Sequence, residues 1–213
     1  MELIKYTVNT GEENMKTDSY LLEEAIRTKK SAPVFRLYGW KPKCISLGRN
    51  QKDLFFNDVE IDVVRRLTGG RALLHDDEVT YSCVIPVSAI PGGESVIESY
   101  KYISGILINF FGTLGISLEY GINKRISTHY DYCMLLSTGA DVCYRGKKII
   151  GSAQFRKEGY ILQHGSILFG YDKKLLETLF NEEVKGITTV REILPDLSKE
   201  DFITKLEAFI SEL

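Results

Sequence analysis

The chain has 213 residues, of which 44% are hydrophobic, and this composition is sufficient to build a buried core. Its 27 basic and 29 acidic residues are spread along the sequence and give a net charge of -2, which disfavours binding to nucleic acid. No apolar run approaches the roughly 20 residues of a membrane span, and the first residues contain no apolar signal-peptide core. We therefore expect one domain over residues 1–213, located in the cytoplasm.

Apolar residues at helical spacing predict three helices. The first is expected over about residues 15–30, where the segment "SAP" follows, and the second over roughly 95–114. The third should begin at the capping-box pair Ser198 and Asp201. It is expected to direct four side chains inward: Phe202, Leu206, Phe209 and Leu213.

Strand-like segments occupy most of the remaining sequence. Residues 33–40 and 43–49 form one candidate pair, and residues 63–70, 71–75 and 79–86 form a run of three. Residues 140–154 and 160–169 supply three or four more strands. Because these clusters are separated by one long helix, they favour an α+β domain with a mixed or antiparallel sheet covered by helices. A doubly wound nucleotide-binding fold is disfavoured.

The four cysteines and three histidines do not form a pattern that is typical of metal binding. There is no C-x-x-C pair and no Cys/His cluster at ligand spacing, so we predict no structural metal. Cys44 and Cys83 lie in apolar strand-like runs and are expected to be core residues. Cys133 can be a small buried side chain or a nucleophile, and Cys143 has a smaller chance of reactivity.

The segment "RRLTGGRALLHD" has two interpretations. Gly69 and Gly70 between strand-like runs are typical of a hairpin turn. Alternatively, the bare amides of the turn, crowded by Arg65, Arg66 and Arg71, could hold a carboxylate, a phosphate or a thioester oxygen. The acids at positions 76–78 could offset the arginine charges, which is the structural alternative to a bound anion.

A second glycine-containing segment, "GKKIIGSAQFRKEGYILQHGS", also has two interpretations. The small residues Gly151, Ser152 and Ala153 mark a strand against which something packs closely, either a helix or a ligand. Lys147 and Lys148 lie about fifteen residues after Cys133, and a returning strand can close that distance. A nearby ammonium group lowers a thiol pKa from its usual value near ~8.5 and so favours the nucleophilic thiolate.

Taken together, these segments resemble a known superfamily. The two glycine motifs, "ENMKTD", "FRLYGWKPKCISLGRNQ" and "ESVIESYKYISGILINFFGTLGI" closely resemble the biotin/lipoate protein ligase superfamily, in particular its cysteine-dependent octanoyltransferases. The resemblance covers most of the chain. It implies an α+β catalytic domain that attaches or transfers an acyl group to one lysine of a small carrier domain.

Two details of the resemblance favour the octanoyltransferase branch over the ATP-dependent lipoate ligases. The chain has Gly-Gly-Arg where the ligases have a third glycine, and Cys133 stands eighteen residues before Gly151, as in the octanoyltransferases. The family lysine that lowers the thiol pKa then falls on Lys148. The chain departs from the family at "CMLLST", where Cys-Phe and a Pro-Ser pair are usual, and at its shorter C-terminus. The wall of the acyl pocket is therefore expected to differ, and the resemblance does not fix chain-length preference or carrier recognition.

The resemblance implies a function and a set of site residues. The implied reaction moves octanoyl from acyl carrier protein to a lipoyl-domain lysine, for example on a glycine cleavage H protein, through a Cys133 thioester and without a cofactor. Cys133 and Lys148 are the implied catalytic residues, and either His164 or Lys148 could assist the acceptor amine. The implied substrate-binding residues are Arg66, Thr68, Gly69, Gly70, Arg71, His75, Gly151, Ser152, Ala153, Gln154, His164 and Gly165.

Two other functions are compatible with the sequence. An ATP-dependent lipoate or octanoate ligase would use the same glycines and Lys148 to hold an acyl-adenylate. A non-catalytic module would bind an acyl group or a carrier without turnover, and the altered "CMLLST" segment favours this third function.

Overall fold

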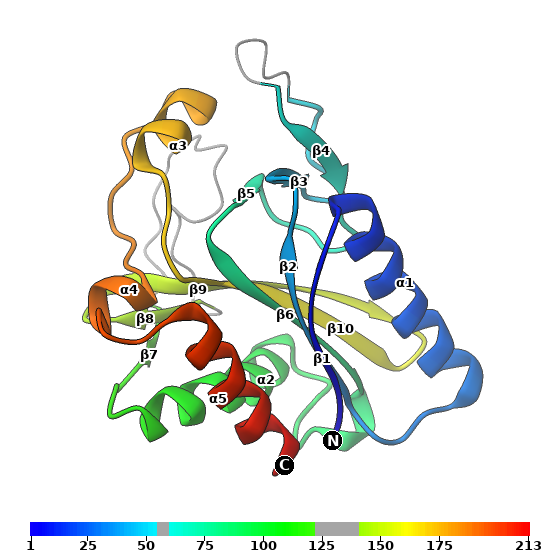
Figure 1. The fold of residues 1–213 in the computed structure, drawn as a ribbon. Coiled ribbons are helices and arrows are strands. Elements are labelled where there is room, and N and C mark those ends of the chain that lie inside the picture. The colour runs from blue at the N-terminus through cyan, green and yellow to red at the C-terminus, as the bar shows by residue number, and fades with distance from the viewer. Residues whose placement is uncertain (55–59, 122–140) are drawn as a thin grey trace.

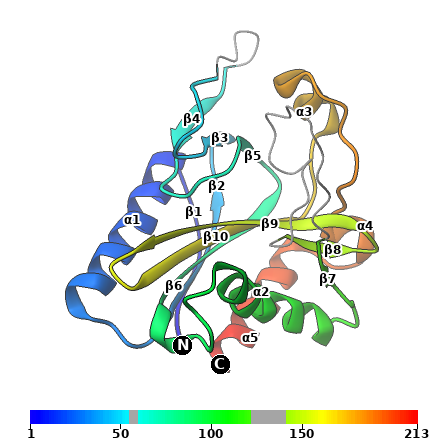
Figure 2. The same cartoon turned by 180° about the vertical axis from the view of Figure 1, so that it is seen from behind.

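The computed structural model describes residues 1–54, 60–121 and 141–213, and these residues build two sheets (Figures 1 and 2). The larger sheet has the strand order β1-β2-β6-β10-β9-β8-β7. Its β1 and β2 are parallel, and every other neighbouring pair is antiparallel. In that order, the strands are Glu2–Asn9, Val34–Trp40, Glu78–Pro86, Tyr160–Leu168, Lys147–Lys157, Val142–Tyr144 and Glu119–Tyr120. The mixed sheet with helices confirms the expected α+β fold.

The smaller sheet has the strand order β4-β3-β5 and lies between helices α1 and α3 (Figure 1). Its strands are Asp62–Arg65, Cys44–Leu47 and Leu73–His75. The central strand β3 is parallel to β4 and antiparallel to β5. In the hydrophobic core beside this sheet, Ile45, Leu47 and Leu74 pack with Leu176 and Phe180 of α3, Lys173–Phe180.

Two expectations about strand pairing are wrong. Residues 33–40 and 43–49 do not pair, because β2 joins the larger sheet and β3 joins the smaller one. The hairpin interpretation of Gly69 and Gly70 also fails, since β4 and β5 lie on opposite sides of β3. The glycine turn is therefore part of a connection that crosses from one side of β3 to the other.

Helices cover both faces of the larger sheet (Figures 1 and 2). On one face, α2, Val96–Thr113, and α5, Lys199–Ser211, bury a core that includes Phe110 and Phe202. On the other face, α1, Gly11–Thr28, packs Leu22 and Ala25 against Val84 of β6 and Leu162 of β10. The short helices η1, Val87–Ala89, and α4, Val190–Ile193, occur in connecting segments.

The three predicted helices are present with shifted ends. Helix α1 begins four residues earlier than expected, because Thr10 and Glu13 form a capping box in which each accepts a hydrogen bond from the other's amide. Helix α5 begins after Ser198 as expected, but Leu213 lies beyond its end and is 57% exposed, so its inward placement is wrong. Ile210 is buried instead. The sequence reasoning did not predict β1, α3 or α4.

Membrane-spanning helices and metal-binding clusters are absent from residues 1–54, 60–121 and 141–213. No helix in these ranges has the combination of length and apolar composition that a membrane crossing requires. The same ranges contain no group of three or more His, Cys, Asp or Glu side chains arranged to hold a metal ion.

Candidate functional site

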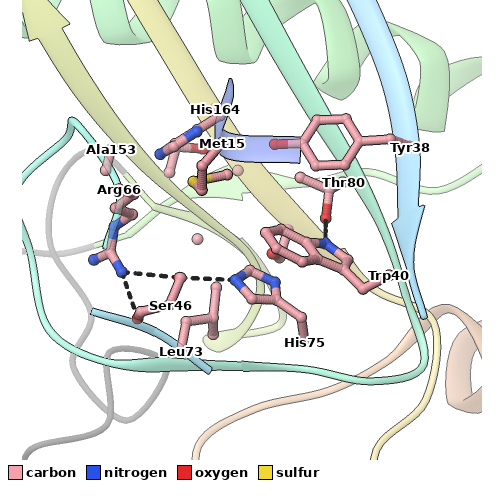
Figure 3. Close-up of a pocket in the computed structure, with 14 residues that line it drawn as sticks. Met15, Tyr38, Trp40, Ser46, Arg66, Leu73, His75, Thr80, Ala153 and His164 are labelled. Atoms are coloured by element: carbon pink, nitrogen blue, oxygen red, sulfur yellow. Dashed lines mark hydrogen bonds between the residues drawn. The ribbon is translucent and has the colours of Figure 1, made fainter. Parts of the chain in front are cut away.

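A narrow pocket lies between the smaller sheet, α1 and strands β9 and β10 (Figure 3). Its walls come from segments that are far apart in the sequence. They are formed by Met15, Tyr38, Trp40, Ser46, Arg66, Leu73, His75, Thr80, Gly151, Ser152, Ala153, His164, Gly165 and Ser166.

Small residues on β9 and β10 form one wall of the pocket. Gly151 and Ser152 on β9 face Ser166 and Gly165 on β10 in the antiparallel register. A Cβ atom at Gly165 would lie 2.6 Å from the Gly151 carbonyl oxygen and 2.8 Å from Cε1 of Tyr81. Position 165 therefore requires glycine for a steric reason, and the small residues keep this wall flat.

His75 lies opposite this wall and is held by a buried carboxylate. Its Nδ1 lies 2.7 Å from Oε1 of Glu78, its Nε2 lies 2.8 Å from Oγ of Ser46, and the Trp40 ring stacks on it at 3.7 Å between centroids. Burial lowers the pKa of His75 below its usual value of 6.5, although Glu78 favours the charged form. The neutral ring thus donates from Nδ1 to Glu78 and accepts at Nε2 from the Ser46 hydroxyl.

Glu78 remains ionised although it is buried. Burial alone raises the pKa of its carboxyl, but the interactions with His75, Thr80 and Ser166 outweigh this effect and leave the pKa below its usual value of 4.5. All three groups bond to the same oxygen, Oε1, at 2.5–2.7 Å. The carboxylate therefore fixes the orientation of His75 and of two hydroxyl groups in the pocket wall.

His164 is held in the same manner by a second carboxylate, that of Asp18 on α1. Nδ1 of His164 lies 3.1 Å from Oδ2 of Asp18, and Nε2 lies 2.7 Å from Oγ1 of Thr68. Asp18 also accepts hydrogen bonds from Arg36, Tyr38 and Ser82. Burial opposes the ionisation of Asp18, but His164, Arg36 and Ser82 together lower its pKa.

The glycine turn is organised by Arg66. Its guanidinium donates to the carbonyls of Gly69 at 2.9 Å, Arg71 at 2.7 Å and Ser46 at 2.8 Å. Gly70 has a φ of +94°, which favours glycine. Within the described residues, the amides of Gly69 and Gly70 donate to no protein acceptor. This arrangement satisfies the carbonyls of the turn and leaves two amides for an anionic or carbonyl oxygen.

The acids at positions 76–78 have other partners than the arginines of the turn. Asp76 pairs with Lys43, Asp77 pairs with Arg191 and Lys199, and Glu78 bonds to His75. These contacts give the acidic segment a structural role outside the turn.

Lys148 is buried at the start of β9 and does not line the pocket. Its Nζ lies 3.0 Å from Oδ1 of Asp141, and its backbone bonds to Gly186 and Thr188. Cys133, the implied nucleophile, lies outside the described residues, so its distance to Lys148 is not part of this structure.

The three described cysteines are buried. Cys44 and Cys83 lie in the core as expected, and burial is the main cause that raises the pKa of each thiol to about 12. Cys143 is opposite Lys148 in the pairing of β8 with β9 and is 3% exposed.

The structure brings most of the implied substrate-binding residues to the pocket or its border. Seven line it directly: Arg66, His75, Gly151, Ser152, Ala153, His164 and Gly165. Thr68, Gly69 and Arg71 bond to lining residues, and Gly70 follows in the same turn. Gln154 lies away from the pocket, where its amide group bonds to Gln163 of β10 and Ser99 of α2.

Sequence reasoning missed half of the lining residues. The missed residues are Met15, Tyr38, Trp40, Ser46, Leu73, Thr80 and Ser166. A usable signal was present for three of them, because Ser46, Thr80 and Ser166 place small hydroxyl groups inside otherwise apolar strands. The carboxylates Asp18 and Glu78, which hold the two histidines, were also missed.

Comparison with known proteins identifies the family to which this chain belongs. The model of the lipoyl protein ligase A/B catalytic domain matches residues 10–211. The chain belongs to the lipoyl protein ligase A/B catalytic domain family. The match includes both glycine segments and every residue that lines the pocket.

Relatives within this family include proteins named octanoyltransferase LipM. The one from Macrococcus caseolyticus is 40% identical over 185 residues, which are 78% of this chain and 65% of that protein. The one from Staphylococcus epidermidis is 35% identical over 221 residues, covering 94% of this chain and 76% of that protein. The chain spans only 65% and 62% of the relatives from M. caseolyticus and Carboxydothermus hydrogenoformans.

Solved structures of lipoyl protein ligases share the fold. A lipoate-protein ligase A bound with ATP superposes with a TM-score of 0.75 at 20% identity, over 99% of this chain and 84% of that one. A bi-partite lipoate protein ligase from Thermoplasma acidophilum, solved in a study of that enzyme and its E2 lipoyl domain, gives a TM-score of 0.70 at 20% identity, over 99% and 82%. At this level of identity the likeness concerns the fold alone.

Proposed function

We propose that this protein transfers an octanoyl group from acyl carrier protein to one lysine of a lipoyl carrier domain, such as a glycine cleavage H protein. Cys133 carries the group as a thioester between the two steps. The observation that carries the proposal is the narrow pocket beside a turn in which the amides of Gly69 and Gly70 have no acceptor among the described residues. The octanoyltransferase relatives, at 35–40% identity, support the same chemistry.

The pocket suits an acyl chain with a polar end. Apolar contacts come from the side chains of Leu73, Met15, Trp40 and Tyr38. Each methylene that is buried in the pocket contributes about 0.8 kcal/mol to binding. The amides of Gly69 and Gly70, which have no acceptor in the part of the chain that the structure describes, can hold the oxyanion that forms on the carbonyl oxygen. Loss of one such donor typically costs about 3 kcal/mol in activation free energy.

The first step exchanges one thioester for another. The Cys133 thiolate attacks the carbonyl carbon of the octanoyl thioester, the bond to the carrier sulfur breaks, and that sulfur leaves as a thiolate and takes up a proton. The ammonium of Lys148 stabilises the Cys133 thiolate by its charge. Asp141, 3.0 Å from that ammonium, holds it in a buried position.

The second step forms an amide. The lysine amine of the lipoyl domain attacks the Cys133 thioester, the new C–N bond forms, the C–S bond breaks, and the nitrogen loses its extra proton. The first step exchanges one thioester for another and the second yields an amide, which is more stable than a thioester, so neither step requires ATP. Cysteine suits both steps since it is a good nucleophile and a good leaving group.

Intact mass spectrometry after incubation with octanoyl-acyl carrier protein tests the thioester. We expect wild type to gain the mass of one octanoyl group, hydroxylamine to remove it, and Cys133→Ala to gain nothing. Cys143→Ala serves as the matched control, because it removes a buried thiol near Lys148 and should leave the adduct unchanged. An adduct of equal yield on Cys133→Ala would exclude the proposed relay. Tight carrier binding with no transfer would favour a non-catalytic module.

A further inference from the structure

Met15 separates the pocket from a second hollow on the outside of the protein. The second hollow is an open groove along α1 and β4, lined by Glu12, Met15, Lys16, Ser19, Val63, Val64 and Arg65. Among the described residues, Met15 alone lines both the pocket and this groove. Its side chain is therefore the partition between them.

Packing fixes Met15 in this position. The half-buried Met15 packs against the cluster of Tyr38, Trp40 and Cys44, together with Val64 of β4. One turn earlier on α1, a Cβ atom at Gly11 would lie 2.4 Å from Sγ of Cys44, so the helix lies as close to β3 as glycine permits. Figure 3 shows Met15 beside His164 and near Tyr38 at the edge of the pocket.

Met15 lies at the end of the pocket away from Lys148. In Figure 1, α1 lies at the right of the view, and β8 with the beginning of β9 lies at the left. From Lys148, strand β9 runs through Gly151 to Ala153, which pairs with His164. An acyl chain whose carbonyl lies at the Lys148 end of β9 therefore extends along this strand towards α1.

We propose that Met15 sets the longest acyl chain that the pocket accepts. This inference rests on the proposed acyl-transfer function. The thioether side chain meets the far end of the acyl chain and closes the path into the groove. Beyond it, Val63 and Val64 offer apolar surface, and Val63 is 42% exposed. Removal of the Met15 side chain would join the pocket to the groove and provide room for additional methylenes.

Binding of straight-chain fatty acids tests this role without requiring turnover. Isothermal titration calorimetry with hexanoate, octanoate, decanoate and dodecanoate would be performed on wild type, Met15→Ala and Met15→Phe. For wild type, we expect the affinity to rise up to octanoate and then to stop rising. For Met15→Ala, it should continue to rise through dodecanoate, by up to about fourfold for each added methylene. Met15→Phe should shift the cut-off to a shorter acid.

The control and the contradicting results separate the two proposals. Lys16→Ala changes the groove without touching the pocket and should behave as wild type. An unchanged cut-off in both Met15 variants would overturn the role of Met15 and leave acyl transfer standing. Absence of binding of every acid to wild type would exclude this pocket as an acyl site and overturn the role of Met15, while the mass measurement of the Cys133 thioester decides acyl transfer independently. If Met15→Ala does not fold, Met15→Phe still decides the matter, because the proposal requires a shorter cut-off for it.

Discussion

At the scale of single residues, each histidine in the pocket wall depends on a buried carboxylate. His75 is bound to Glu78, three positions away, and His164 is bound to Asp18, which is 146 positions away. Both carboxylates are ionised in the fold because their hydrogen bonds outweigh the cost of burial. The pocket thus has fixed donors and acceptors beside its apolar surfaces, which sets the orientation of a bound molecule.

The titration of these residues predicts a loss of stability on acidification. The pKa of His75 is lowered in the fold, so below pH 6.5 the unfolded chain binds a proton that the folded protein does not, and the free energy of unfolding falls. Glu78 and Asp18 also have lowered pKa values. Their contribution is present above pH 4.5 and 3.8 respectively and is lost as the pH falls through their folded-state values.

Urea denaturation at a series of pH values from neutral to acid measures both effects. The variant His75→Asn should lose the decrease that begins near pH 6.5 and keep the decrease at lower pH. An equal free energy of unfolding of wild type at neutral pH and just above pH 4.5 would contradict the assignment of a neutral His75.

At the scale of elements, the connection between β4 and β5 joins the two sheets. Thr68 in this connection bonds to His164 of β10, and Arg66 bonds to the carbonyls of Gly69 and Arg71. A connection that crosses β3 would be mobile without such contacts. The hydrogen bond from Thr68 therefore holds the glycine turn against the larger sheet.

The variant Thr68→Val tests this contact. Valine has the shape of threonine but no hydroxyl, so the buried Nε2 of His164 loses its hydrogen-bond partner. We expect a decrease of about 1–3 kcal/mol in the free energy of unfolding. Amide hydrogen exchange in the turn should become faster. Thr68→Ser retains the hydroxyl and should keep slow exchange. Equal exchange rates in the two variants would show that packing, and not the hydroxyl, holds the turn.

The helices and strands were predictable where the pattern is local. Apolar spacing located α2, and Ser198 with Asp201 located the start of α5. The pairing of the strands was not predictable in this way. Strand β3 follows β2 in the chain but belongs to the other sheet, and nothing in the sequence of residues 33–49 indicates this. Strand β1 was missed since it lies at an edge, where half-exposed residues give a weak pattern.

At the scale of the whole molecule, the pocket exists because the two sheets and α1 meet. Its glycine and small-residue walls were predictable, since such residues mark close approach. Met15 and Trp40 were not predictable. Met15 lies on α1 and Trp40 ends β2, and only the packing of α1 against the larger sheet brings the two side chains together. The distance of about fifteen residues from Cys133 to Lys147 and Lys148 was read from the sequence, and the resemblance to a family singled out Lys148, while Asp141 beside Lys148 is known only from the structure.

The most direct test of the account is transfer to an acceptor protein. Purified protein would be incubated with a glycine cleavage H protein and either octanoyl-acyl carrier protein without ATP or octanoate with ATP. Peptide mass spectrometry would locate the product. We predict octanoylation of a single lysine with the carrier thioester alone. Modification only with octanoate and ATP, accompanied by pyrophosphate release, would contradict the account and identify the protein as an ATP-dependent ligase.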